Sequence, residues 1–151
     1  MEYSILLIDD EESIHQLLPY FLVKKKKHRF TVHSAVNGKA GVEMYSKLES
    51  EGQKPDFVLM DLRMPVMDGV EATKRVIEKD PGANIYLFTA YTNTQEERDA
   101  LKAGAKLTIS KDADWHRTVE NILNVLESGQ EKINYRHRLT QINTDDKNQY
   151  G

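Results

Sequence analysis

Five polar residues of this sequence stand at or just after the ends of short apolar segments, and their side chains suit phosphoryl chemistry. They are Asp9, Asp10, Asp61, Thr89 and Lys111. Three carboxylates against one ammonium leave excess negative charge, which a divalent cation would offset. The available ligands are hard oxygen atoms without histidine, so they favour Mg²⁺ over zinc. With metal bound, one carboxylate can attack phosphorus while Lys111 and Thr89 stabilise the phosphoryl oxygens.

Four short apolar runs are predicted to position these residues as strands. Each run is too short for a buried helix, and the continuous apolar character of the first three suits strands covered on both faces of a parallel sheet. The runs are Ile5–Ile8, Phe57–Met60, Ile85–Phe88 and Leu107–Ile109. A weaker segment, Phe30–Ala35, alternates only in part and is predicted to be an edge or half-covered strand.

Between these strands, apolar residues recur with the spacing of a helix. The stripes lie within residues 14–22, 41–48, 70–77, 100–101 and 115–126. Asn37, Asp68 and Thr94 stand where helix N-caps are expected, the last two with capping-box spacing. Pro19 lies inside the first stripe and is expected to kink or divide that helix.

The resulting order is a strand followed by a helix, repeated five times. Right-handed crossovers convert this order into an open α/β fold: a five-stranded parallel sheet, doubly wound with helices on both faces, of the flavodoxin-like (βα)5 kind. Ligand sites in such sheets lie at the carboxyl ends of the strands. The polar residues are therefore expected to converge on one edge of the sheet.

Composition narrows the class of protein further. The chain has 151 residues, a net charge of −3 and no cysteine, which fits one globular domain without disulfides or thiolate sites. The mild acidic balance gives no reason to expect direct binding to nucleic acid. The start lacks the features of a signal peptide, and no apolar run approaches the length of a membrane span. We expect a cytoplasmic protein that does not bind membranes.

One stretch carries a family resemblance. Residues 61–69 read Asp-Leu-Arg-Met-Pro-Val-Met-Asp-Gly, and their partners are Asp9-Asp10, Thr89-Ala90, Ala103-Gly104-Ala105 and Lys111. From about Tyr3 to Gly129 the chain resembles the receiver domain of bacterial and archaeal two-component response regulators. We therefore predict a receiver domain over residues 1–129 and a C-terminal extension over 130–151, partly helical and then disordered.

The resemblance implies a role for each site residue. Asp61 would accept a phosphoryl group from a sensor histidine kinase or phosphotransfer protein. Asp10 would bind Mg²⁺ directly, Asp9 through water, and Arg63 through its backbone carbonyl.

The remaining two residues would stabilise the phosphoryl group and pass on the signal. Lys111 would pair with Asp61 and then with the phosphoryl group. Thr89 would move toward that group and signal to an effector protein through the fourth helix, fifth strand and fifth helix. The protein would be a switch, with only self-phosphorylation and self-dephosphorylation, and no enzyme in the ordinary sense.

Two positions depart from the family pattern. Thr108 replaces the frequent aromatic residue three positions before the lysine, and Asp112 replaces the proline that usually follows it. Tyr91 is a candidate substitute reporter of activation. Arg63 and Tyr91 also occupy positions that flank the path of attacking water in this family, which predicts slow loss of the phosphoryl group.

Three alternatives remain open. A pseudo-receiver would bind partners without phosphorylation, although the intact Asp61, Thr89 and Lys111 argue against it. A haloacid dehalogenase-type phosphatase needs a second aspartate where Arg63 stands. A flavodoxin-like electron carrier conflicts with acidic strand ends, which would repel a flavin phosphate.

The basic run from Lys24 to Arg29 has two interpretations. We interpret it as a solvated helix end, where cations suit the helix dipole. Attraction of an acidic partner or a phosphate backbone is the alternative.

Overall fold

The computed structural model describes residues 1–128, which form a five-stranded sheet and five helices. The strands are β1 (Glu2–Ile8), β2 (Arg29–Ala35), β3 (Phe57–Met60), β4 (Ile85–Thr89) and β5 (Thr108–Ser110). The labelled helices are α1 (Glu12–Val23), α2 (Gly38–Ser50), α3 (Gly69–Lys79) and α4 (Gln95–Ala103), and a further helix spans 115–128. None of the helices within 1–128 is long and apolar enough to cross a lipid bilayer.

All neighbouring strands are parallel, in the order β2-β1-β3-β4-β5. This order confirms the predicted doubly wound parallel sheet and the edge position of the segment that became β2. The register aligns Ile8 with Met60, and Thr89 with Ser110. The strands that carry the candidate site residues therefore end together along one edge of the sheet.

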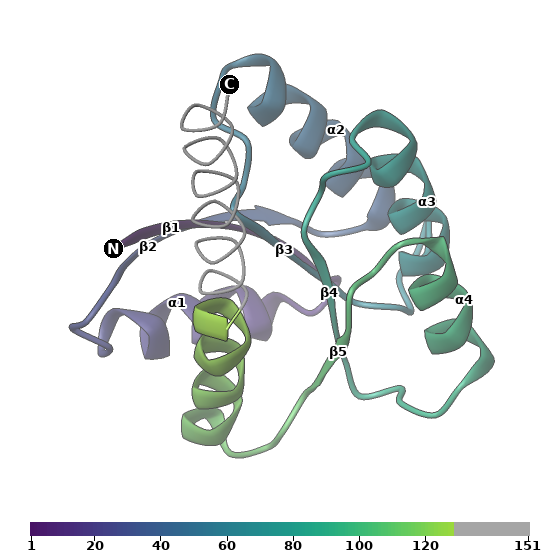
Figure 1. Cartoon of the computed structure of the whole chain (residues 1–151). Coiled ribbons are helices and arrows are strands. Elements are labelled where there is room, and N and C mark those ends of the chain that lie inside the picture. The colour runs from purple at the N-terminus through teal and green to yellow at the C-terminus, as the bar shows by residue number, and fades with distance from the viewer. Residues whose placement is uncertain (129–151) are drawn as a thin grey trace, which may run out of the picture. The chain divides into compact units, whose positions relative to one another are not determined.

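Helices cover both faces of the sheet, as continuous apolar strands require. Figure 1 shows α2, α3 and α4 on one face and α1 on the other. Every residue of β3 and β4 is buried. Alternate strand residues such as Leu6, Val58 and Leu87 join one core with Val42 of α2 and Val76 of α3. Burial on both faces accounts for the unbroken apolar runs in the sequence.

The helix starts confirm the predicted N-caps. The side chains of Asn37, Asp68 and Thr94 accept hydrogen bonds from backbone N–H groups three residues later, at 2.8, 2.9 and 3.2 Å. At Pro19, where a kink or a division of the helix was expected, α1 is not divided, and the kink stays a prediction. Burial of Ile14, Leu18 and Leu22 along a single apolar face holds the helix together through the proline.

The chain divides into two compact units. The first, Met1–Val119, contains the sheet and α1 to α4, and the second begins at Glu120. The predicted extension over 130–151 lies outside the described residues, so its helical and disordered character stays a prediction.

Candidate functional site

The carboxyl ends of four strands bring the predicted polar residues to one edge of the sheet. Asp9 follows β1, Asp61 follows β3, Thr89 ends β4 and Lys111 follows β5. The backbone N–H of Lys111 donates to the Thr89 carbonyl at 3.0 Å, and the Asp61 N–H donates to the Ile8 carbonyl at 2.9 Å. Extension of the sheet's hydrogen bonding past the strand ends therefore fixes the backbone at the site.

Lys111 is the centre of the charged group. Its Nζ lies 2.7 Å from Asp9 Oδ2, 3.0 Å from Asp61 Oδ2 and 3.7 Å from Glu11 Oε1. It donates a hydrogen bond to Asp61 Oδ2, whereas its contact with Asp9 Oδ2 is an ion pair without hydrogen-bond alignment. One ammonium thus serves two carboxylates that are almost completely buried, Asp9 at 0% and Asp61 at 3% exposure.

Burial and charge oppose each other at these groups. Burial raises the pKa of Asp9 above its ordinary value, and the attraction of Lys111 offsets only part of that rise. For Lys111, burial lowers the pKa, but the attraction of Asp9 and Asp61 outweighs burial and leaves the pKa raised. Lys111 therefore stays protonated at neutral pH, between two carboxylates that one positive charge does not neutralise.

The acidic group contains a residue that the motif did not predict. Carboxylate oxygens of Asp9, Glu11 and Asp61 all lie within 4.8 Å of one another. Glu11 reaches the group because its backbone N–H donates to Asp9 Oδ1 at 2.9 Å, which turns the chain back toward the sheet edge. The only signal for it in the sequence was its position two residues after Asp9. Asp10 is exposed and is not a member of this group, so its role as metal ligand stays a prediction.

The loop after β3 fixes the Asp61 carboxylate. The Leu62 N–H donates to Asp61 Oδ1 at 2.8 Å, which leaves Oδ2 facing Lys111. Gly69 starts α3 directly against this turn, and a Cβ at that position would lie 2.0 Å from the Asp61 backbone oxygen. The glycine of the motif is therefore required by close packing at the site.

His15 packs against the same edge from α1. Its Nε2 lies 2.6 Å from the Asp9 backbone oxygen, so the ring N–H donates to that carbonyl. This contact ties the first turn of α1 to the residue after β1. Sequence reasoning did not identify His15, because nothing in its spacing distinguished it from an ordinary helix residue.

Arg63 and Tyr91, which the resemblance placed on the path of water, lie in direct contact. The Arg63 guanidinium carbon is 3.8 Å from the centre of the Tyr91 ring, and Arg63 Nε donates to Glu96 Oε2 at 2.9 Å. The Tyr91 N–H donates to Thr89 Oγ1 at 3.1 Å. The loop after β3 is thereby joined to the loop after β4 and to the start of α4.

The two positions that depart from the family pattern are both polar. Thr108 begins β5, and its Oγ1 is buried without a hydrogen-bond partner among the described residues. The Asp112 N–H donates to Thr118 Oγ1 at 3.2 Å.

Sequence comparison identifies the family. The profile of the response regulator receiver domain matches residues 5–123. The chemotaxis protein CheY of Halobacterium salinarum is 35% identical over 126 residues, covering 83% of this chain and 98% of that protein. CheY of Thermotoga maritima is 34% identical over 120 residues, covering 80% and 94% of the two chains.

Structural comparison gives the same fold. A crystal structure of a CheX–CheY–BeF3–Mg²⁺ complex from Borrelia burgdorferi matches with a TM-score of 0.70 and 25% identity, over 82% of this chain and 88% of that chain. A CheY-like receiver domain from Methanospirillum hungatei matches with a TM-score of 0.71 and 22% identity, over 87% and 99%.

Proposed function

This chain belongs to the response regulator receiver domain family, and we propose that it works as a phosphoryl-accepting switch in two-component signalling. The acceptor is Asp61, and the donor is a sensor histidine kinase, a phosphotransfer protein or a small phosphodonor. One observation carries the proposal. Asp61 is buried within an acidic group at the carboxyl edge of a parallel sheet, with Lys111 3.0 Å from its outward oxygen.

The chain's own residues account for the transfer step. An Asp61 carboxylate oxygen forms a bond to phosphorus while the bond from phosphorus to the donor breaks, and the donor leaves with that electron pair. Asp61 Oδ1 already accepts from the Leu62 N–H, so Oδ2 is the oxygen presented for attack. The Lys111 ammonium shifts its contact from the carboxylate to the phosphoryl oxygens. Its positive charge there supplies the electrostatic stabilisation that phosphoryl transfer requires.

Mg²⁺ fits the donor set. Three carboxylates lie within reach of one ion, and the single ammonium of Lys111 is shared between the two buried carboxylates, Asp9 and Asp61. We propose that Asp9, Asp10, Asp61 and the Arg63 backbone carbonyl hold the ion, with Glu11 adding negative charge at the rim. Bound there, Mg²⁺ would supply positive charge to the attacking carboxylate and the phosphoryl oxygens.

The signal leaves the site through the loop after β4. Thr89 Oγ1 now accepts from the Tyr91 N–H, and a rotation of the side chain that carries this hydroxyl to a phosphoryl oxygen would move Oγ1 away from that N–H. Because Tyr91 stacks on Arg63, a shift of Thr89 disturbs the contact between the two loops. This coupling supports Tyr91 as the reporter in place of an aromatic at position 108.

The switch acts on other proteins. We propose an effector that recognises α4 and β5, with the fifth helix as the third element that the family resemblance implies, and a cytoplasmic setting in which a kinase reaches Asp61. The catalytic capacity is limited to self-phosphorylation and self-dephosphorylation. A pseudo-receiver is not favoured, because the Asp61, Lys111 and Thr89 arrangement is intact.

Backbone NMR of the ¹⁵N-labelled protein tests the switch. Addition of BeF3⁻, which binds aspartate carboxylates as a phosphoryl analogue, together with Mg²⁺ is expected to shift the amide signals of Leu62, Thr89 and Tyr91. The same additions to Asp61→Asn serve as the matched control. A wild-type spectrum unchanged beyond that of the control would refute the proposed switch.

A further inference from the structure

A pocket of about 600 Å³ lies between the carboxyl end of α1 and the start of β2, away from the acidic site. Its apolar lining comprises Pro19, Leu22, Val23, Phe30 and Val32. Its basic lining comprises Lys25, Lys26, His28 and Arg29. No acidic residue lines it among those the structure describes.

One residue of the apolar lining, and a tyrosine near it on α1, are exposed to solvent. Val23 is 77% exposed at the last position of α1, and Tyr20, one turn earlier, is 54% exposed. On the same helix, the Lys24 ammonium lies 4.3 Å from the Tyr20 ring centre. A solvated helix end accounts for the lysines through the helix dipole. It does not account for a strongly exposed valine in the apolar lining of a concave, basic surface.

The basic rim contains charges that a partner can engage. Lys26 and Arg29 are exposed. The ion pair of Arg29 with Glu2 is long at 3.9 Å, with both side chains at least 80% exposed, so it contributes little and exchanges readily.

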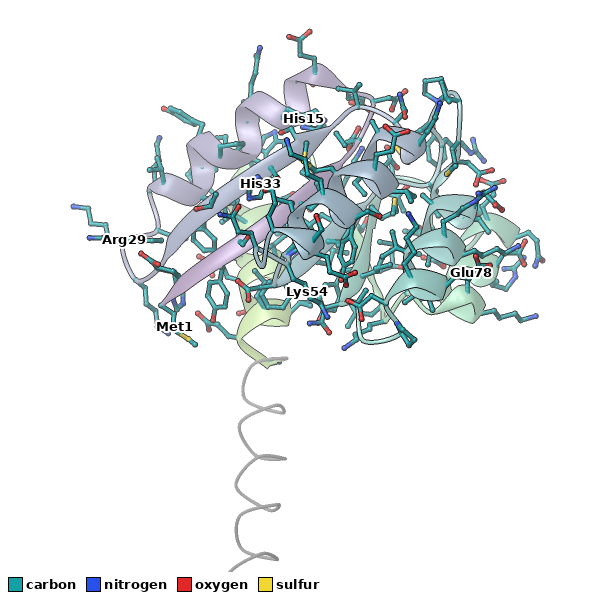
Figure 2. The ribbon with its side chains drawn as sticks, turned by 90° about the horizontal axis from the view of Figure 1, so that it is seen from above. Met1, His15, Arg29, His33, Lys54 and Glu78 are labelled. Carbon is teal, nitrogen blue, oxygen red and sulfur yellow. The ribbon has the colours of Figure 1, made fainter. Side chains whose placement is uncertain are left out.

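The pocket lies far from the candidate phosphorylation site. Arg29 pairs with Glu2 at the amino end of the sheet, and Figure 2 shows Arg29 beside Met1, at the other end of α1 from His15. The seven residues of β1 separate that end from Asp9, which corresponds to about 20 Å along the strand. A partner in the pocket leaves the acidic edge accessible to a phosphodonor.

We propose that this basic pocket docks an acidic segment of a protein partner, with one aliphatic or aromatic side chain of that segment inserted between α1 and β2. Charge complementarity selects the acidic chain, and the apolar lining selects the inserted side chain. Duplex nucleic acid matches the positive charge of the pocket but not its apolar lining, because a phosphate backbone carries no apolar side chain to insert. Docking is independent of the state of Asp61 and therefore gives the switch a second, constitutive contact.

Fluorescence anisotropy with a designed probe tests the proposal. The probe is a labelled peptide of glutamate residues around a single phenylalanine, and its comparator has glycine in place of the phenylalanine. Burial of the ring is expected to make the phenylalanine peptide bind about tenfold more tightly than the comparator. Val23→Ser is expected to reduce that preference, and added salt to weaken both peptides.

Charge variants separate the pocket from the overall charge of the protein. Lys26→Glu with Arg29→Glu is expected to weaken the phenylalanine peptide about tenfold or more. Lys39→Glu with Lys74→Glu changes the net charge equally at exposed sites elsewhere and is expected to leave binding within about twofold. The Asp61→Asn variant is expected to bind the phenylalanine peptide as tightly as the wild type does. The peptide measurement therefore tests docking even if Asp61 proves not to accept a phosphoryl group.

Two results would overturn the docking proposal. One is equal binding of the phenylalanine and glycine peptides, which would remove the role of the apolar lining. The other is that duplex DNA or phosphatidylserine vesicles bind more tightly than the phenylalanine peptide. In that case their binding would be lost with Lys26→Glu and Arg29→Glu but unaffected by Val23→Ser. That pattern would assign the surface to a phosphate-bearing partner.

Discussion

At the scale of single residues, the site depends on one ammonium that serves two buried carboxylates. Lys111 contacts Asp9 and Asp61 at 2.7 and 3.0 Å, and Glu11 extends the acidic group to the surface. A buried ion pair that leaves one carboxylate undercompensated is poor for stability but suited to binding a cation. The arrangement therefore favours a ligand-dependent site over a structural salt bridge.

The identity of the metal ligands is the first prediction at this scale. Asp10 is exposed and can reorient toward an ion, so Asp10→Asn is expected to weaken Mg²⁺ binding roughly tenfold or more. Glu11→Gln removes only a rim charge, and a loss of about two- to threefold is expected. Isothermal titration with MgCl2 measures both variants against the wild type. The reverse order would transfer the ligand role from Asp10 to Glu11.

The stacked pair of Arg63 and Tyr91 gives the second prediction. If these side chains restrict water at the acyl phosphate, Arg63→Ala and Tyr91→Ala should each shorten its lifetime. Because the two groups are in contact at 3.8 Å, the double variant should show less than the sum of the single effects. The decay of the phosphorylated mass after removal of the donor measures the lifetime. A lifetime unchanged in both single variants would contradict this role.

At the scale of elements, strands and caps were predictable because local signals and tertiary burial agree. The run Phe57–Met60 is entirely buried in β3, and Asn37, Asp68 and Thr94 cap their helices as predicted. Where the two signals disagree, packing decides the outcome: of the kink or division expected at Pro19, a division does not occur, since the buried face of α1 continues on both sides. Burial of the apolar face of α1 therefore outweighs the local disruption that a proline causes inside a helix.

Thr108 supplies a prediction for β5. Its hydroxyl is buried without a hydrogen-bond partner in the described part of the chain, and valine has nearly the same shape. Thr108→Val is therefore expected to leave stability unchanged or raise it by about 1 kcal/mol, because an unsatisfied polar group disappears. Urea unfolding measures the free energy of unfolding. A loss of more than about 1 kcal/mol would indicate that the hydroxyl has a structural partner.

Asp80 joins α2 to the end of α3 and gives a pH-dependent prediction. Its carboxylate accepts from the Tyr45 hydroxyl at 2.6 Å and from the Gly82 N–H at 3.0 Å, and pairs with Lys54 at 2.5 Å. Led by Lys54 and then Tyr45, these contacts lower the pKa of Asp80 to about 2. A lowered folded-state pKa means that the carboxylate stabilises the fold above its unfolded pKa of about 4. That contribution is lost as the pH falls toward 2.

Asp80→Asn is accordingly expected to lower the free energy of unfolding by about 1 kcal/mol near neutral pH. Solvent screening at the surface keeps this value small. Relative to the wild type, the cost should shrink as the pH is lowered from about 5 to about 3. Thermal unfolding across this range provides the measurement. Glu78→Gln, at an exposed carboxylate of α3, is the control. A cost that stays constant with pH would show that the charge of Asp80 does not stabilise the fold.

At the scale of the whole molecule, the parallel sheet was predictable and the surfaces were only partly so. Strand ends in a parallel sheet must meet at one edge, so the convergence of Asp9, Asp61 and Lys111 followed from the order of elements. The membership of Glu11 did not follow, because it depends on how a loop turns. The pocket beside Arg29 was also missed, since its lining comes from two elements whose contact the sequence does not specify.

The acidic site and the basic pocket lie at opposite ends of the sheet. Acidic chemistry occupies the carboxyl end of the sheet, and the basic pocket occupies the amino end, beside Arg29. Because β1 separates them, we expect occupation of one to leave the other accessible. A signalling protein built this way can be held by one partner while it receives a phosphoryl group from another.

If Asp61 accepts a phosphoryl group, intact-mass spectrometry detects the added mass. The protein is incubated with acetyl phosphate and Mg²⁺, beside an EDTA-treated sample and Asp61→Asn. A single phosphoryl adduct is expected on the wild type; it should need Mg²⁺ and be absent from the variant. A folded wild-type protein that gains no adduct with any phosphodonor, or an adduct that persists in Asp61→Asn, would contradict this expectation.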